Sequence, residues 1–189
     1  DVSGVVDLSV SGTSNIGADV TTTGTQGYSG TTTLSGGDRT LTASTVTLNA
    51  VTGGSNALTV TGNLELDGAI SGVTNMSVSG TSNIGADVTT TGTQSYTGTT
   101  TVSANSTLIG TEISAAAIAL NDDLEIRNSS DSTLASVISG TGALTKSGSG
   151  ALTLRGINTF DGDLTVSAGT LYAGLAADSG NQVIENNVT

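Results

Sequence analysis

Carboxylates are the side chains in this sequence whose spacing could support chemistry. Asp122, Asp123 and Glu125 form the densest acidic cluster, and Asp161 and Asp163 form a second one with a single residue between them. Two carboxylates whose pKa values are split can act as general acid and general base on a glycosidic bond. Carboxylate oxygens are also the ligands that calcium prefers. The two clusters are therefore the first candidates for a polysaccharide-cleaving site or a calcium site.

Neither cluster is accompanied by the other residues that this chemistry needs. Cleavage of the pectate-lyase type also requires a well-placed basic side chain, and Arg39, Arg127 and Arg155 each stand alone in the sequence. Neither cluster matches the glycine- and aspartate-rich nonapeptide of calcium-binding β-rolls. The absence of Cys and His excludes the usual zinc sites and any catalysis by these residues. We therefore expect no catalytic, cofactor-binding or metal-binding residue, and we expect the carboxylates to lie in solvated loops.

Two further classes of ligand are excluded by composition and motif. The chain has 16 acidic and four basic residues, for a net charge of −12, whereas binding to nucleic acid or an anionic membrane needs a positive surface. The stretch Ser147–Gly150 is rich in glycine, but a phosphate-binding loop also needs a following helix and a terminal Lys-Ser/Thr pair. We expect these glycines to form turns, and we expect no nucleic-acid partner.

Threonine runs are the remaining candidate for a binding surface. Alternate side chains of a strand point outward, so runs of three threonines would place two hydroxyls on the surface. These hydroxyls either serve as polar, β-branched filler or form an adhesive or self-associating face. An ice-binding array is a weaker alternative, because the runs do not recur once per coil. The runs are Thr21–Thr23, Thr31–Thr33, Thr89–Thr91 and Thr99–Thr101.

The elements that must position these residues are short β-strands. Gly, Ser and Thr make up 87 of the 189 residues (27, 25 and 35), and only four residues are aromatic. Hydrophobic residues nevertheless make up 35% of the chain, in short in-out-in runs that are typical of strands rather than of disorder. Glu112–Leu120 is rich in alanine and could form a helix, although its strand-like neighbours favour another strand. The clearest runs are Leu8–Val10, Val46–Leu48, Leu58–Val60, Leu64–Leu66, Met76–Val78, Leu124–Ile126, Leu152–Leu154 and Leu164–Val166.

An internal repeat decides between the all-β architectures. Residues 8–35 recur as residues 76–103, with 24 of 28 positions identical at an offset of 68. A sandwich would need more aromatic residues to fill the gap between its sheets, whereas a narrow solenoid can fill its interior with stacked Val, Leu, Ile, Ala and Thr. We therefore predict that residues 1–189 form one continuous parallel β-helix, right-handed by expectation. Coils of roughly 20–23 residues would fit three to each repeat and about nine to the chain.

Residues 139–174 resemble the autotransporter-associated β-strand repeat of bacterial type V secreted proteins. Phe160 replaces the usual Tyr of the family pattern, and Leu164 replaces a usual Thr. The earlier repeats are similar to coils of filamentous-haemagglutinin-type surface proteins. The positions that match the β-strand repeat are Gly142, Leu144, Lys146, Gly148, Gly150, Leu152, Leu154, Gly156, Asn158, Thr159, Gly162, Val166, Gly169, Thr170 and Leu171.

The resemblance implies a secreted or surface-exposed bacterial β-helix that crosses the outer membrane unfolded, with an outer-membrane translocator as its partner during secretion. It transfers no catalytic residue. The expected function is that of a non-catalytic adhesin or spacer rod in adhesion, aggregation or biofilm, with a glycan or protein of a host or neighbouring cell as a partner. The alternative is a subunit of extracellular fibres that associates laterally or end to end. A polysaccharide-acting enzyme is a third hypothesis.

Overall fold

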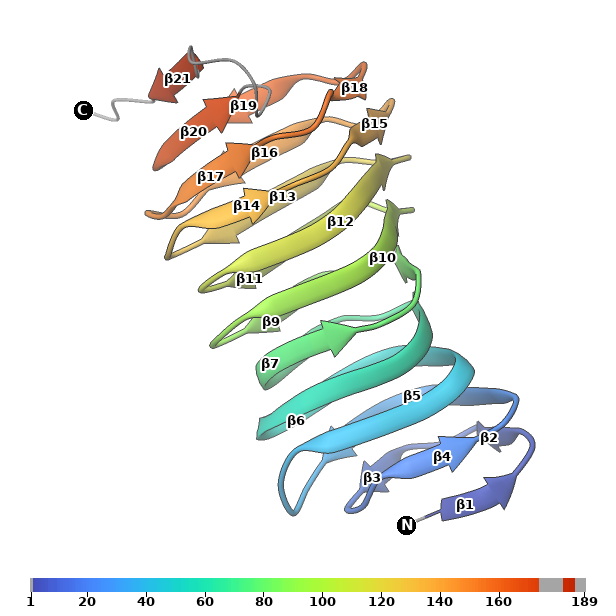
Figure 1. Ribbon diagram of the computed structural model, residues 1–189. Helices are drawn as coiled ribbons and strands as arrows, with labels where there is room; N and C mark the ends of the chain where they lie inside the picture. The colour runs from blue at the N-terminus through green and yellow to red at the C-terminus, as the bar shows by residue number, and fades with distance from the viewer. Residues whose placement is uncertain (1, 174–181, 186–189) are drawn as a thin grey trace.

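The computed structural model describes residues 2–173 and 182–185, and every regular element in these residues is a β-strand (Figure 1). The strands lie one above another along an elongated solenoid, with the N-terminal and C-terminal strands at opposite ends. They are β1 (Val2–Val5), β2 (Leu8–Val10), β3 (Ser14–Ile16), β4 (Val20–Thr22), β5 (Thr25–Leu34), β6 (Arg39–Leu66), β7 (Ile70–Val78), β8 (Ser82–Ile84), β9 (Val88–Thr90), β10 (Gln94–Val102), β11 (Ser106–Gly110), β12 (Ile113–Leu120), β13 (Leu124–Asn128), β14 (Ser132–Leu134), β15 (Ile138–Gly140), β16 (Leu144–Ser147), β17 (Ala151–Leu154), β18 (Thr159–Phe160), β19 (Leu164–Val166), β20 (Thr170–Ala173) and β21 (Gln182–Glu185).

The strands form a parallel β-solenoid of about nine coils, as the sequence predicts. The solenoid has three long faces, which we call A, B and C. Face A contains β1, β4, β14, β17 and β20, face B contains β2, β8, β15 and β18, and face C contains β3, β9, β11, β13, β16 and β19. The longer strands β5, β6, β7, β10 and β12 bend around corners and contribute to more than one face. Among the strands of the described residues, only β21 is antiparallel, to β20.

The coils are mostly shorter than the sequence predicts. Ser14 contacts Thr32 one coil further on, a step of 18 residues, and Asp123 contacts Ala143, a step of 20 residues. Three coils therefore contain fewer than the 68 residues that separate the two copies of the repeat. The second copy begins three coils and two further strands after the first. The first Ser-Asn-Ile segment, β3, consequently lies on face C, whereas its copy β8 lies on face B. The prediction of three whole coils per repeat was wrong.

The interior is a narrow stack of aliphatic side chains, as predicted. Inward positions alternate with outward ones along each strand, and the Leu, Val and Ile residues at inward positions of β6 to β13 are almost fully buried. The alanine-rich segment is strand β12, not a helix, because its inward Ile113, Ile118 and Leu120 stack on the coils at either side. Tertiary stacking here outweighs the helix propensity of alanine.

One buried polar arrangement occurs in both copies of the repeat. Tyr96 Oη donates a hydrogen bond to Gln94 Oε1 at 2.9 Å, and Gln94 Nε2 donates to the carbonyls of Val88 and Ile109 at 3.0 and 2.8 Å. Tyr28 and Gln26 repeat the contact at 3.0 Å. Burial raises the pKa of Tyr28 to about 12 and raises the pKa of Tyr96 as well. The two copies of this arrangement lie on different faces of the solenoid. The repeated sequence therefore forms the same hydrogen bonds on either face.

Candidate functional site

Several carboxylates tie one coil to the next. Asp7 Oδ1 accepts the backbone N–H of Thr25 at 2.7 Å and the hydroxyl of Thr25 at 2.9 Å, and these bonds lower the pKa of Asp7. The same carboxylate–amide contact recurs along the solenoid, each time about one coil further on in the sequence. The other pairs are Asp19–Thr40, Asp38–Ala57, Asp87–Thr107, Asp123–Ala143 and Asp131–Ala151, at 2.7–3.0 Å. These aspartates are exposed and lie between strands, as expected for loop carboxylates, and in addition each accepts a hydrogen bond from the next coil.

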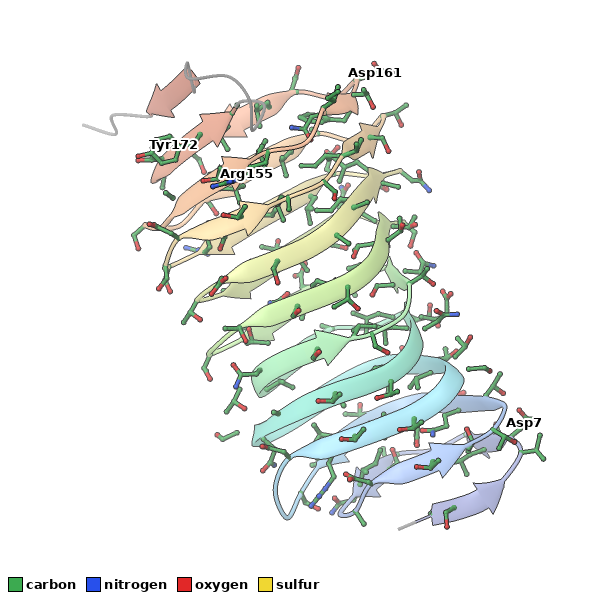
Figure 2. All side chains as sticks on the ribbon, viewed as in Figure 1. Asp7, Arg155, Asp161 and Tyr172 are labelled. Carbon is green, nitrogen blue, oxygen red and sulfur yellow. The ribbon has the colours of Figure 1, made fainter. Side chains whose placement is uncertain are left out.

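The densest acidic cluster is divided between such structural contacts. Asp123 binds the N–H of Ala143, Asp122 Oδ1 accepts the N–H of Asp123 at 3.0 Å, and Glu125 Oε1 accepts the Ser147 hydroxyl. Asp123 and Glu125 also line one depression of about 260 Å³, together with Ser106, and each of these two carboxylates already accepts a hydrogen bond. Asp161 and Asp163 flank the corner before β19, and Figure 2 shows Asp161 at the outer edge of this corner. Within the described residues, no group of three or more Asp, Glu, His or Cys side chains could hold a metal ion.

Lys146, one of the four basic residues, also has a structural position. It lies fully buried on β16, and at the corner that follows its Nζ donates hydrogen bonds to the carbonyls of Ser147, Gly148 (2.9 Å) and Ala168 (3.2 Å). Burial lowers the pKa of this amine. Gly148, in the stretch that resembled a phosphate loop, has φ +78° and turns the chain there, as a turn glycine should. The amine is directed into its own turn, where it holds two coils together.

The threonine runs alternate as predicted but do not lie over one another. The central residue of each run is buried, with exposures of 0–4% for Thr22, Thr32, Thr90 and Thr100, and its neighbours point outward. However, the first run lies on face A, the second and third on face C, and the fourth on face B. The runs therefore do not form a single hydroxyl-bearing face.

A series of hydroxyls from Thr and Ser residues does recur on face A, in residues that are far apart in the sequence. The strands that carry it lie one above another in Figure 1. Registered pairs join its members in three runs, and the series is continued by Tyr172 on β20, which Figure 2 shows near the C-terminal end. We call this series the hydroxyl column; it consists of Thr21 and Thr42, then Thr59, Ser77, Ser95 and Ser114, then Thr133 and Thr153. The recurrence of Ser or Thr once per coil is the sequence signal that identifies it.

The other faces do not offer such a surface. The outward series on face C begins with Asn15, continues with Thr33 and Thr52, and is interrupted further on by Ile109 and Arg127. On face B, the carboxylate of Glu65 accepts a hydrogen bond from Asn83 Nδ2 at 2.9 Å, and Ala119 interrupts the series further on. The hydroxyl column contains no charged and no aliphatic residue, and its members are half-buried or exposed. Ser114 Oγ already donates to the Gln94 carbonyl at 3.3 Å, and the other members can offer one donor and one acceptor per coil, about 4.8 Å apart, to an extended partner.

Comparisons with known proteins identify one segment of the chain. Residues 144–173, which form β16 to β20, match the passenger-associated-transport-repeat family. No curated protein and no solved structure matches the chain. None of the described residues forms a helix long and apolar enough to cross a membrane. The chain carries a passenger-associated-transport-repeat, and this repeat together with the β-solenoid fits the β-helix of an autotransporter passenger.

Proposed function

We propose that this chain is a non-catalytic rod of an exported bacterial passenger protein, and that it acts at the cell surface in adhesion or aggregation. The passenger-associated repeat supports export through an outer-membrane translocator. The division of the densest carboxylate cluster among structural contacts supports a role without catalysis. The hydroxyl column is the observation that carries the proposal, because it repeats one type of side chain on one face over most of the solenoid.

The partner that best fits this column is an extended polymer rich in hydroxyl groups, such as a surface polysaccharide. Each hydrogen bond to a neutral hydroxyl contributes about 0.5–1.5 kcal/mol, so a single coil would bind very weakly. Several coils acting on one polymer chain would bind measurably, because the second and later contacts form within the same complex. Affinity should therefore increase with the length of the polymer.

The test compares the chain with a variant that lacks three adjacent hydroxyls, Ser77→Ala/Ser95→Ala/Ser114→Ala. Co-sedimentation with insoluble polysaccharides and with intact bacterial cells should show at least a tenfold loss of binding. A matched control on face B, Ser9→Ala/Ser139→Ala, should bind like the unchanged chain. Equal binding by the column variant and the control would contradict the proposal.

Lateral pairing of rods is the second candidate, because the hydroxyl column is as well suited to a second hydroxyl column as to a polysaccharide. The net charge of −12 opposes such pairing at low salt, so pairing should increase as salt screens the charge. Light scattering across a salt series measures it, and electron microscopy would show bundled rods. Scattering that stays constant with salt, or that is unchanged in the column variant, would exclude this candidate.

A further inference from the structure

The N-terminal end of the solenoid exposes the inside of its first coil. This coil consists of β1, β2 and β3, and among the described residues these strands pair only with the coil that follows them. Val2 and Val5 are 41% and 37% exposed, and Leu8 and Val10 are only partly buried. A depression of about 400 Å³ lies here, lined chiefly by Val2, Leu8, Val10, Ile16, Val20 and Tyr28. In Figure 1 these strands form the end of the stack beside the N-terminus.

The internal repeat provides the same coil a second time, in the middle of the chain. The match extends back before Leu8, because Ser3, Gly4 and Val5 recur as residues 71–73. Gly4 has φ +75° and its copy has φ +66°, so the backbone conformation recurs too. Val2 pairs with Val20, and their copies Ile70 and Val88 pair in the same way. The register of the following coil is therefore also the same. The two copies are therefore one structural unit observed in two situations.

The second copy is covered on the side where the first copy is open. Residues 51–66 form the preceding coil, in which Val51 pairs with Ile70, Leu58 with Met76, and Leu64 with Ser82. Under this coil Ile70 is 1% exposed, and Val73 is fully buried. Their counterparts at the open end are about 40% exposed although their sequence and backbone are nearly the same, so the covering coil accounts for the difference.

We propose that the first coil is an acceptor surface for one further parallel β-solenoid coil with the chemistry of residues 51–66. The partner coil has aliphatic side chains at the positions equivalent to Val51, Leu58, Val60, Leu64 and Leu66. These side chains fill the depression at the open end of the first coil. This inference concerns the end of the rod and does not depend on the adhesive role of face A. It identifies the partner by the pattern of its strands.

The backbone of the second copy shows which hydrogen bonds such a coil would make. Ser79 N–H donates to Val60 O at 3.0 Å, Gly80 N–H donates to Gly62 O at 2.9 Å, and Leu64 N–H donates to Thr81 O at 2.8 Å. The corresponding groups at the open end belong to residues 11–13. A partner coil in the same register would therefore pair the edge of the first coil as well as bury its aliphatic side chains.

Gly12 provides a specific test of the register. A Cβ atom at Gly12 would meet no heavy atom within 4 Å, so alanine is sterically acceptable in the chain as it stands. At its copy, Gly80, a Cβ atom would lie 2.5 Å from the carbonyl oxygen of Gly62 in the covering coil. Alanine at position 12 should therefore leave the first coil intact and prevent a partner coil from stacking on it.

The experiment places a second copy of residues 51–69 directly before Val2, in the relation that residues 51–69 already have to Ile70. Amide hydrogen exchange of β2 and β3 should slow at least tenfold relative to the unextended chain, at every protein concentration. The matched control carries the same extension with serine at its copies of Leu58, Val60, Leu64 and Leu66, and it should leave exchange unchanged. Adding Gly12→Ala should abolish the slowing in the extended chain and have no effect in the unextended one.

Three outcomes would overturn the inference. The first is unchanged exchange in the extended chain, and the second is equal slowing by the serine control, which would mean that any added segment suffices. The third is slowing that appears in the unextended chain as its concentration rises, because a second copy of the chain would then be the occupant. Circular dichroism of each variant establishes that the rest of the solenoid is folded.

Discussion

The buried pair Gln94 and Tyr96 offers the sharpest test of the interior. Tyr96→Phe removes one hydroxyl and leaves the ring in place, so the aliphatic packing is preserved. The substitution breaks the 2.9 Å bond to Gln94 Oε1 and leaves that oxygen, on a fully buried side chain, without its donor. A buried acceptor without a partner costs about 1–3 kcal/mol, so we expect the free energy of unfolding to fall by about 2 kcal/mol.

Gln94→Leu should cost more than Tyr96→Phe. It leaves the carbonyls of Val88 and Ile109 without the amide that binds them at 3.0 and 2.8 Å, and it also leaves the Tyr96 hydroxyl without its acceptor. The Ile109 carbonyl keeps the bond from Thr90 Oγ1 at 3.3 Å, so two buried groups lose their partner, and at about 1–2 kcal/mol each the loss is about 2–4 kcal/mol. The double variant should cost about 1–2 kcal/mol less than the sum of the two single variants, because the Tyr–Gln bond is counted twice in that sum.

Urea unfolding followed by circular dichroism measures these differences. The repeat supplies a matched pair, Tyr28→Phe and Gln26→Leu, in which the same bond measures 3.0 Å and the Gln26 amide also donates to two carbonyls. We expect similar losses and similar coupling at both sites. A loss below about 0.5 kcal/mol for Tyr96→Phe, or strict additivity of the two substitutions, would refute the argument that this network specifies the interior.

Three further predictions concern the ties between coils. Asp7→Asn should leave the melting temperature at pH 7 unchanged, because its counterpart Asn75 accepts the same bond from the Thr93 N–H at 2.8 Å, whereas Asp7→Ala should lower it. Because hydrogen bonds lower the pKa of Asp7, its contribution is present above about pH 4 and is lost as the pH falls through the lowered value, so an acid titration of the Asn variant should lack this part of the loss. Gly68→Ala should prevent stable folding, since its Cβ would lie 1.7 Å from the carbonyl oxygen of Asn49, whereas Gly17→Ala, with its nearest neighbour at 3.6 Å, should express and melt normally; equal melting curves would contradict this. Lys146→Met should leave three carbonyls at the corner after β16 without their amine donor and cost about 3 kcal/mol or more, with earlier proteolysis of the C-terminal coils than in the exposed control Arg155→Met.

The sequence predicts the class of fold well because the inward positions follow a simple alternation. Segments such as Leu58–Val60 and Leu124–Ile126 are buried at both ends and outward in the middle, as their pattern indicates. The buried Thr22 and Thr100 follow from the same rule. Each short strand directs only a few side chains inward, and the corners between strands are rich in glycine. Together these two features favour a narrow solenoid over other all-β folds.

The coil length and the binding surface could not be predicted in the same way. Ser, Thr and Gly fit both strands and corners, so the sequence does not show where a coil closes, and the offset of 68 suggested three equal coils. The structure closes its coils sooner, as the step of 18 residues from Ser14 to Thr32 shows, and this places the copies Ser14 and Ser82 on different faces. A coil of roughly 20–23 residues does not place Ser77 beside Ser95, whereas the shorter coil of the structure does.

The carboxylates show a second limit of sequence reasoning. Asp19 and Asp131 each bind a backbone N–H about one coil further along the chain, and Asn63 and Asn75 make the same contact with an amide oxygen. Asp and Asn are therefore interchangeable at these corners. These contacts depend on the spacing between coils and not on charge. They therefore produce no compact acidic motif that could be recognised in the sequence.

Cysteine pairs would test most directly the central claim that the short coils bring Ser77 and Ser95 into register and thereby align the hydroxyl column. The chain has no cysteine, so Ser77→Cys/Ser95→Cys introduces the only two thiols. These residues are registered partners on neighbouring strands, and a separation of about 4.8 Å between their Cα atoms allows a disulfide. The account predicts rapid, nearly complete oxidation of this pair and slow oxidation of Thr74→Cys/Ser95→Cys, whose wider spacing suits a longer coil. Preferential oxidation of the second pair would contradict it.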